Sequence, residues 1–376
     1  RPRECLFHGL PTELLCAIFM MCGEIDDFSV YPRDPSLDPY LLYPKPIRYS
    51  QTTILLGYVC SRWLTVTRGC PQLWTMVDLP FPQRRDVTVL ALCLHYSAGL
   101  PMTLHIVDDE RYPVKDRNLD VWRRFVRIVA SAAQRWTGIH ISIRAKNLRA
   151  TLRLWDVFYA SSALRAVRWH NIVVDVHAHA HTLRHLTYVS VNHILSLHVM
   201  ELFRACPRLQ VFEGTIVPPR SFLFGREADT RVPALATPIT LPHLRILMLS
   251  GGDMPDLASL FDGLMVPLLD RLDLGTTNMQ AHAIECMLKR SSARLFMLTL
   301  RHISSGKRNI ERIKALLRCP ALQQLKIFLY QPYHDSDFDL RPCVPPNVVL
   351  YTSVYQHADD TYHLATTGRK EGNRIL

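Results

Sequence analysis

Leucine occupies the first, fourth and sixth positions of the stretch Leu244-Arg245-Ile246-Leu247-Met248-Leu249. The same apolar spacing returns three times farther along the chain, at Leu269-x-x-Leu272-x-Leu274, Leu295-x-x-Leu298-x-Leu300 and Leu322-x-x-Leu325-x-Ile327. Successive copies begin 25, 26 and 27 residues apart. Side chains alternate between the two faces of a β-strand, so the fourth and sixth positions of each copy point the same way. We therefore expect neighbouring parallel strands with four inward-facing leucines: Leu247, Leu272, Leu298 and Leu325.

Related copies precede these four at less regular intervals. They read Trp136-x-x-Ile139-x-Ile141, Leu164-x-x-Val167-x-Trp169, Leu183-x-x-Leu186-x-Tyr188 and Leu209-x-x-Phe212, with intervals of 28, 19 and 26 residues and then 35 before Leu244. Residues 101–106 are interpreted as an earlier strand and residues 348–350 as the last. The longest interval contains residues 217–240, whose Pro and Arg content predicts a protruding loop.

Helical periodicity fills several of the intervals, for example at Leu257, Leu260, Phe261 and Leu264. One strand and one helix per period of about 20 to 29 residues is typical of leucine-rich repeats. The predicted fold class is an α/β solenoid, a leucine-rich-repeat-like stack of parallel strands and helices over residues 81–352. Curved repeat arrays bind ligands on their concave face. We therefore expect a protein target there, near strand residues such as Arg245 and Arg271.

A different pattern occupies the N-terminal residues 1–80. Pro11 and Glu13 suit the first turn of a helix, where proline loses no hydrogen bond and a carboxylate meets the positive helix end. A broad apolar stripe follows, formed by Leu14, Leu15, Ile18 and Phe19. Five prolines between Tyr31 and Tyr49 predict a loop, and helical periodicity resumes near Thr53.

Four elements in this region, three motifs and one insert, occur in the same order as in a known family. They are Leu10-Pro11-x-Glu13-Leu14-Leu15-x-x-Ile18-Phe19, a variable insert, Val59-Cys60-Ser61-Arg62-Trp63, and Pro71-x-Leu73-Trp74. The set resembles the F-box of the F-box-like proteins abundant in mushroom-forming fungi, and the downstream region resembles the degenerate leucine-rich repeats that follow such F-boxes. The resemblance covers about residues 9 to 79. The proline-rich insert, 31–49, is longer than in a compact F-box.

The resemblance implies a small all-α, three-helix module that docks a Skp-type adaptor and, through it, a cullin-based SCF ubiquitin ligase. The protein would then be the ligase's substrate-recognition subunit, a non-enzyme without catalytic residues, cofactor or metal, whose solenoid binds a protein substrate that the sequence does not identify. The candidate adaptor-binding residues are Leu10, Pro11, Leu14, Leu15, Ile18, Phe19, Val59, Trp63 and Trp74. Two alternatives stay open: these side chains cement the module onto the next domain, or a vestigial F-box caps a scaffold unrelated to ubiquitin.

A third alternative, from another class, is a metal-dependent hydrolase. His177, His179 and His181 alternate along the chain and would share one face of a strand, as zinc ligands can. Their position just before Leu183 instead suits a helix end or a loop, and no Asp or Glu ligand recurs at a fixed spacing. We therefore favour the interaction protein over the hydrolase.

Charge and cysteine content limit the remaining classes. The formal net charge of +11 comes with scattered arginines and no RNA-binding motif, so it favours acidic partners generally rather than nucleic acid. Ten cysteines without a Cys-x-x-Cys pair favour reduced, buried thiols. No secretory signal and no apolar run of about 18 to 20 residues is found, so we expect no membrane span and a cytoplasmic or nuclear protein. The chain begins with Arg1, which leaves open whether a segment precedes it. Residues 353–376 lack apolar periodicity and are expected to form a mobile tail.

Overall fold

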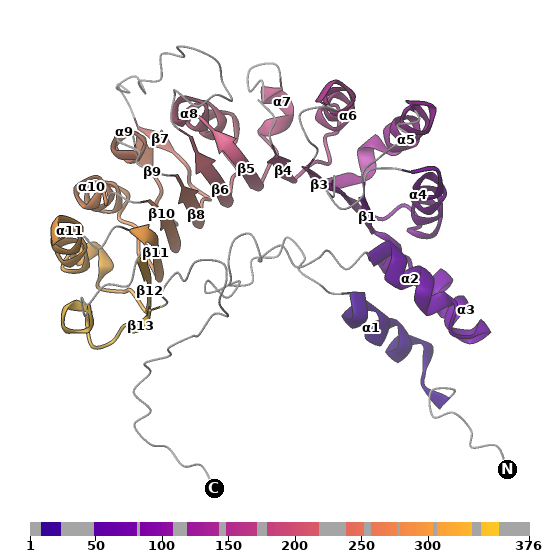
Figure 1. The fold of residues 1–376 in the computed structure, drawn as a ribbon, viewed down its shortest axis with the longest axis horizontal. Coiled ribbons are helices and arrows are strands. Elements are labelled where there is room, and N and C mark those ends of the chain that lie inside the picture. Colours follow the sequence, from indigo (N-terminus) through magenta and orange to yellow (C-terminus); the bar gives the residue numbers. More distant parts are fainter. Residues whose placement is uncertain are drawn as a thin grey trace, which may run out of the picture. The chain divides into compact units, whose positions relative to one another are not determined.

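The fold is described from a computed structural model (Figure 1). It describes residues 9–23, 49–80, 83–107, 119–142, 148–170, 179–217, 238–251, 257–276, 279–303, 307–332 and 340–352. The described residues up to His170 form one compact unit, and those from His179 onward form a second. The predicted domain boundary after residue 80 lies inside the first unit. The proline-rich insert, apart from Tyr49, and the C-terminal tail lie outside the described residues.

The first unit begins with three helices: α1 (Thr12–Gly23), α2 (Tyr49–Gly57) and α3 (Ser61–Gly69), followed by the short helix η2 (Pro71–Trp74). As predicted, α1 starts directly after Pro11. The three helices pack around Leu15 and Phe19, which are 0% and 1% exposed. The Trp74 indole N–H donates to the Thr67 carbonyl over 2.7 Å and closes the end of α3 onto η2.

A parallel sheet continues the first unit. Its strands follow chain order: β1 (Met76–Pro80), β2 (Met102–Val107), β3 (Trp136–Ser142) and β4 (Ala166–His170). Helices α4 (Arg84–Tyr96), α5 (Leu119–Ser131) and α6 (Leu148–Tyr159) connect them and cover one face (Figure 1), with the short helix η3 (Ala133–Arg135) after α5. The predicted strands at 101–106, 139–141 and 167–169 are confirmed, whereas β1 was not predicted.

The second unit repeats the same alternation. Its main strands are β5 (Tyr188–Ile194), β6 (Val211–Ile216), β8 (Ile246–Ser250), β10 (Arg271–Gly275), β11 (Met297–Ile303), β12 (Ile327–Pro332) and β13 (Val349–Thr352). They pair in that order, and all of these pairs are parallel. A separate parallel pair joins β7 (Ile239–Thr240) to β9 (Leu264–Met265). The helices are α7 (Ala180–Leu183), α8 (Ser196–Ala205), α9 (Leu257–Asp262), α10 (Ala281–Ser291) and α11 (Lys307–Leu317), with the short helices η5 (Pro320–Leu322) and η6 (Arg341–Cys343).

The core of the second unit lies between these strands and the helices α8 to α11, which cover one face of the sheet (Figure 1). Leu247 lies opposite Leu272, and Leu272 lies opposite Leu298 on the next strand. All three leucines are 0% exposed. The prediction that they are inward-facing residues of neighbouring parallel strands is therefore confirmed.

Leu325 corrects the fourth member of that prediction. Leu298 lies opposite Phe328, while Leu325 is buried in the loop before β12 begins. The predicted repeat started three residues too early. Leu322, the predicted first leucine of this copy, belongs to the helical turn η5, and the copy begins at Leu325. The same slip affects Leu183, which lies in α7.

The coarse prediction of the fold is thus confirmed as a parallel α/β arrangement. In the described parts of the chain, a helix lies between successive strands of the two sets described above, from β1 to β4, between β5 and β6, and from β8 to β12, as connections between parallel strands require. Among the described residues, no helix is long and apolar enough to cross a membrane.

Candidate partner-docking surface

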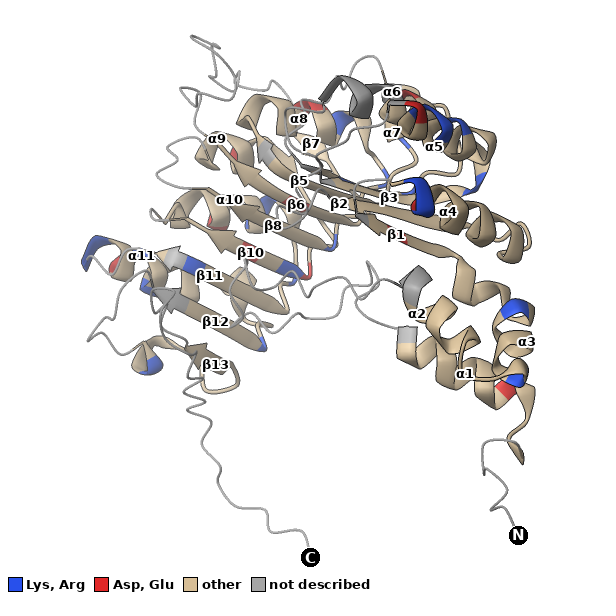
Figure 2. Ribbon diagram, turned by 45° about the vertical axis from the view of Figure 1, so that its right-hand side comes forward, with Lys and Arg blue, Asp and Glu red and all other residues tan. Residues whose placement is uncertain are grey.

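Helix α1 presents apolar side chains to solvent. Leu14, Ile18 and Met21 are 52%, 38% and 69% exposed and recur at a spacing of four and three residues, which places them on one face of the helix. Apart from Glu13, the helix carries no charged residue (Figure 2). The solvent-exposed side of α1 is therefore almost uncharged. This is unusual, because the solvent-exposed side of a surface helix is normally polar.

A second exposed apolar group lies at the junction of α2 and α3. Leu55, Tyr58 and Val59 are 64%, 81% and 60% exposed. Helix α2 carries no charged residue, and it packs on α1 within the three-helix group. We call Leu14, Ile18, Met21, Leu55, Tyr58 and Val59 the apolar docking residues. Exposed large apolar side chains concentrated on one small module mark interaction sites more often than single scattered ones do.

The helix junctions beneath these residues are held by specific contacts. The Phe19 and Trp63 rings pack with centroids 4.7 Å apart, which joins α1 to α3. The Cys60 sulfur caps α3 by accepting a hydrogen bond from the Trp63 amide over 3.5 Å. The Arg62 guanidinium donates to the Leu10 carbonyl and ties the start of α1 to the same helix. The exposed residues therefore sit on a packed support.

The structure separates the predicted adaptor-binding residues into two groups. Pro11, Leu14, Ile18 and Val59 are exposed, and Leu10 and Trp63 are half-buried. Leu15, Phe19 and Trp74, which were also predicted to bind the adaptor, are 0%, 1% and 4% exposed and lie inside the module. A side chain already enclosed by its own module cannot bury further area against a partner. These three residues therefore support the surface from within.

Three docking residues were missed from the sequence: Met21, Leu55 and Tyr58. A signal was available for two of them. Met21 follows Ile18 by three residues, and Leu55 precedes Val59 by four, so each continues a helical face already singled out. No comparable periodicity indicated Tyr58.

The histidine cluster does not form a described metal site. His179 lies in the turn before α7 and His181 lies exposed within α7, so this part of the cluster is not an alternating strand. His177 lies outside the described residues. Across the parts of the chain that the structure describes, no group of three or more His, Cys, Asp or Glu side chains could hold a metal ion.

The described cysteines are free thiols. Burial raises the pKa of Cys93 and of Cys206 to about 12, which keeps both thiols protonated and unreactive at neutral pH. In α1, burial and a hydrogen bond with Cys70 raise the pKa of Cys16 to about 11, whereas Cys22 at the end of the same helix is exposed. These features fit packing roles for the buried thiols rather than catalysis.

Comparison with known proteins adds no further assignment. The sequence matches no protein-family model, and no curated protein matches it.

Proposed function

We propose that this protein is the substrate-recognition subunit of an SCF-type ubiquitin ligase. In this proposal the three N-terminal helices are an F-box-like module that docks a Skp-type adaptor, and the downstream strands and helices are a leucine-rich-repeat-like solenoid that binds the protein target. The observation that carries the proposal is the exposure of Leu14 and Ile18, 52% and 38%, inside the motif that resembles an F-box.

The energetics favour a partner at this surface. Fully burying an exposed large apolar side chain contributes about 1.5 to 3 kcal/mol. The six apolar docking residues are between 38% and 81% exposed, so covering them contributes a corresponding fraction of this for each residue, against which the cost of association is set. Small modules bury a small fraction of their own surface and leave apolar side chains available in this way.

The alternative that these side chains cement the module onto the next part of the chain is less well supported. That contact is made by other residues: the Trp74 and Tyr96 rings lie 4.9 Å apart, and the Arg68 guanidinium lies 5.9 Å from the Tyr96 ring. Trp74 is buried, whereas Leu14, Ile18 and Val59 stay exposed after this packing is complete. Packing of the module and docking of a partner would thus use different side chains.

Under this proposal the protein contributes no reactive group. The assembled ligase would bring the target and the activated ubiquitin together, and proximity would supply the rate advantage. The role also implies a cytoplasmic or nuclear location. No described feature favours the metal-dependent hydrolase.

The decisive experiment measures the affinity of the full chain for a purified Skp-type adaptor. Leu14→Asp places a carboxylate where apolar surface must leave water, which costs several kcal/mol. We expect adaptor affinity to fall by roughly a hundredfold or more, since about 1.4 kcal/mol corresponds to tenfold. Leu268→Asp is the matched control, because Leu268 is 51% exposed in the second unit and should leave adaptor affinity unchanged.

Folding of each variant must be measured alongside. All six tryptophans of the chain precede residue 170, so tryptophan fluorescence during thermal unfolding reports on the first unit. A folded Leu14→Asp variant with unchanged affinity would refute adaptor docking at this face and leave the vestigial-cap alternative. If Leu14→Asp unfolds the unit, Val59→Asp, at a 60% exposed position, provides the same test.

A further inference from the structure

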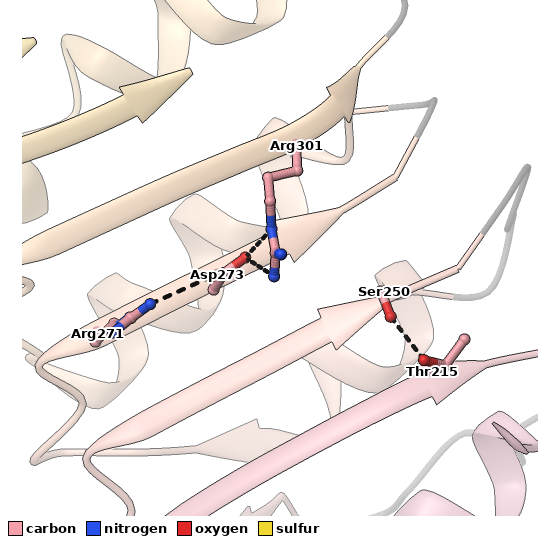
Figure 3. Close-up of polar contacts among 5 residues, drawn as sticks. All are labelled: Thr215, Ser250, Arg271, Asp273 and Arg301. Atoms are coloured by element: carbon pink, nitrogen blue, oxygen red, sulfur yellow. Dashed lines mark hydrogen bonds and ion pairs between the residues drawn. The ribbon is translucent and has the colours of Figure 1, made fainter. Parts of the chain in front are cut away.

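Two arginines converge on one buried carboxylate in the second unit (Figure 3). Asp273 of β10 accepts hydrogen bonds at Oδ1 from Nε and Nη2 of Arg301 on β11, over 3.0 and 2.8 Å. Its other oxygen, Oδ2, lies 3.5 Å from Nη2 of Arg271. All three side chains alternate with the core-facing Leu272, Leu274, Leu298 and Leu300. They therefore project from the sheet face turned away from α8 to α11, which we call the open face.

The cluster carries more positive charge than its carboxylate neutralises. Two guanidinium groups meet one carboxylate, which leaves a net charge of +1. The Asp273 side chain is 2% exposed, whereas Arg271 and Arg301 retain 13% and 19% exposure. Each guanidinium has five N–H donors, so several remain after the contacts with Asp273 are counted.

Two buried polar atoms beside the cluster lack a hydrogen-bond partner among the described residues. They are Nε of Arg271 and the hydroxyl of Thr299, a residue that is 0% exposed. Thr299 lies opposite Asp273 on the next strand and shares the open face. Buried donors without acceptors cost free energy, so this part of the face is suited to an incoming acceptor.

The surroundings of the cluster differ on its two sides. Toward β6 the hydroxyls of Thr215 and Ser250 are paired at 2.8 Å (Figure 3), and Gly275 places no side chain between Ser250 and Arg301. Farther in that direction the face carries an acid, Glu213, which accepts from the Tyr188 hydroxyl over 3.0 Å. An acidic ligand would meet repulsion there.

Toward β13 the open face carries several apolar side chains. Leu329 lies opposite Thr299 on one side and Tyr351 on the other. Val349 and Tyr351 are 51% and 41% exposed, and they follow the same alternation as Leu329. A ligand whose negative group meets the arginines could therefore lay an apolar side chain on this end of the face.

We propose that the open face of β8 to β13 binds an extended acidic segment of a protein. Carboxylates of the segment contact the exposed parts of Arg271 and Arg301, and an apolar residue of the segment packs on Val349 and Tyr351. Asp273 neutralises part of the positive charge of both guanidinium groups and so lowers their attraction for the ligand. The inference rests on the proposed function in that the segment would belong to the ligase target.

The first test uses the full chain and two fluorescein-labelled peptides of ten residues. One alternates Glu with Val, and the other replaces each Glu by Gln. We expect the Glu peptide to bind at least about tenfold more tightly by fluorescence polarisation, and its affinity to fall as salt is raised because exposed charges are screened. Equal affinity for the two peptides would overturn the proposal.

The second test separates ligand binding from a purely structural ion pair. Arg301→Gln should weaken the Glu peptide by roughly tenfold to a hundredfold, the range expected for charge-assisted hydrogen bonds. Asp273→Asn removes the internal competitor and should tighten the peptide by about tenfold. A structural ion pair predicts no tightening, so unchanged or weaker binding by a folded Asp273→Asn variant refutes the proposal. Arg318→Gln, an exposed position following α11, makes the same charge change on the helical side and should have no effect.

Measuring adaptor affinity in the same variants distinguishes failure of the acidic-segment proposal from failure of the proposed function. Arg301→Gln and Asp273→Asn should leave adaptor binding unchanged, and Leu14→Asp should leave peptide binding unchanged. Loss of both activities in one variant, together with a lowered unfolding temperature, would assign that residue to stability and count against a binding role.

Discussion

Replacing Leu272 by Ala tests the register of the second unit directly. Leu272 is 0% exposed and lies between Leu247 and Leu298 on the helix-covered face of the sheet. The change removes three carbon atoms, worth about 0.8 kcal/mol each in transfer free energy. The cavity left in a close-packed core adds to this loss, and the total reaches about 3 to 5 kcal/mol of the free energy of unfolding. The free energy of unfolding falls by about 2 to 3 kcal/mol for each 1 M of urea, so the urea midpoint of unfolding should fall by about 1 M or more.

The matched control is Leu268→Ala, four residues earlier, where the leucine is 51% exposed and truncation should cost less than about 1 kcal/mol. Far-UV circular dichroism follows both units, while tryptophan fluorescence follows the first unit alone because all six tryptophans precede residue 170. We expect Leu272→Ala to shift the circular dichroism transition more than the fluorescence transition. Equal costs for the two substitutions would refute the inward orientation of Leu272 and, with it, the register across β8, β10 and β11.

Two further predictions use thiols as reporters. Cys22 is exposed one helical turn beyond Ile18, so adaptor binding should slow its alkylation by iodoacetamide, as measured by peptide mapping. The alkylation rate of Cys286 in α10 should stay the same and serves as the control. An unchanged rate at Cys22 would argue against adaptor docking on this face of α1. Burial raises the pKa of Cys206 to about 12, whereas an unfolded thiol ionises near about 8.5. Between these two pKa values the native state keeps a proton that the unfolded state releases. The free energy of unfolding should therefore fall as the pH rises from about 8.5 toward 12. Urea titrations of Cys206→Ala should show a weaker dependence of this free energy on pH.

The strands were predictable because their core-facing residues are mostly leucine, isoleucine and valine at a spacing of two, with aromatic residues such as Trp169, Phe212 and Phe328 at some of these positions. The pattern failed where another apolar residue stood three positions earlier, as Leu322 does before Leu325. Strand β1 was missed for a different reason: it contains Asp78 and ends at Pro80. Asp78 points to the face of the sheet opposite the core. Its Oδ1 lies 3.0 Å from Nδ1 of His105 on the next strand, and this contact allows the strand to contain a charged residue.

The sequence predicted the helix that carries Leu14 and Ile18, but it did not predict which side of that helix would be exposed. Leu14, Leu15, Ile18 and Phe19 form a stripe too broad for one side of a helix to be chosen from spacing alone. The choice depends on where α2 and α3 pack, since Phe19 meets the ring of Trp63 and thereby turns Leu14 and Ile18 outward. That contact joins residues 44 positions apart across the proline-rich insert, and no local pattern encodes it.

The arginine cluster depends on register in the same way. Arg271 and Asp273 are two residues apart on one strand, but Arg301 reaches them only because Gly275 lies opposite it and leaves the approach to Asp273 open. The two proposed surfaces then rest on different forces. Apolar burial at Leu14 and Ile18 responds little to salt, whereas the attraction of Arg271 and Arg301 for an acidic segment is screened by it. Raising the salt concentration should therefore release the acidic segment while the adaptor stays bound, and a protein using one surface for both partners could not separate them this way.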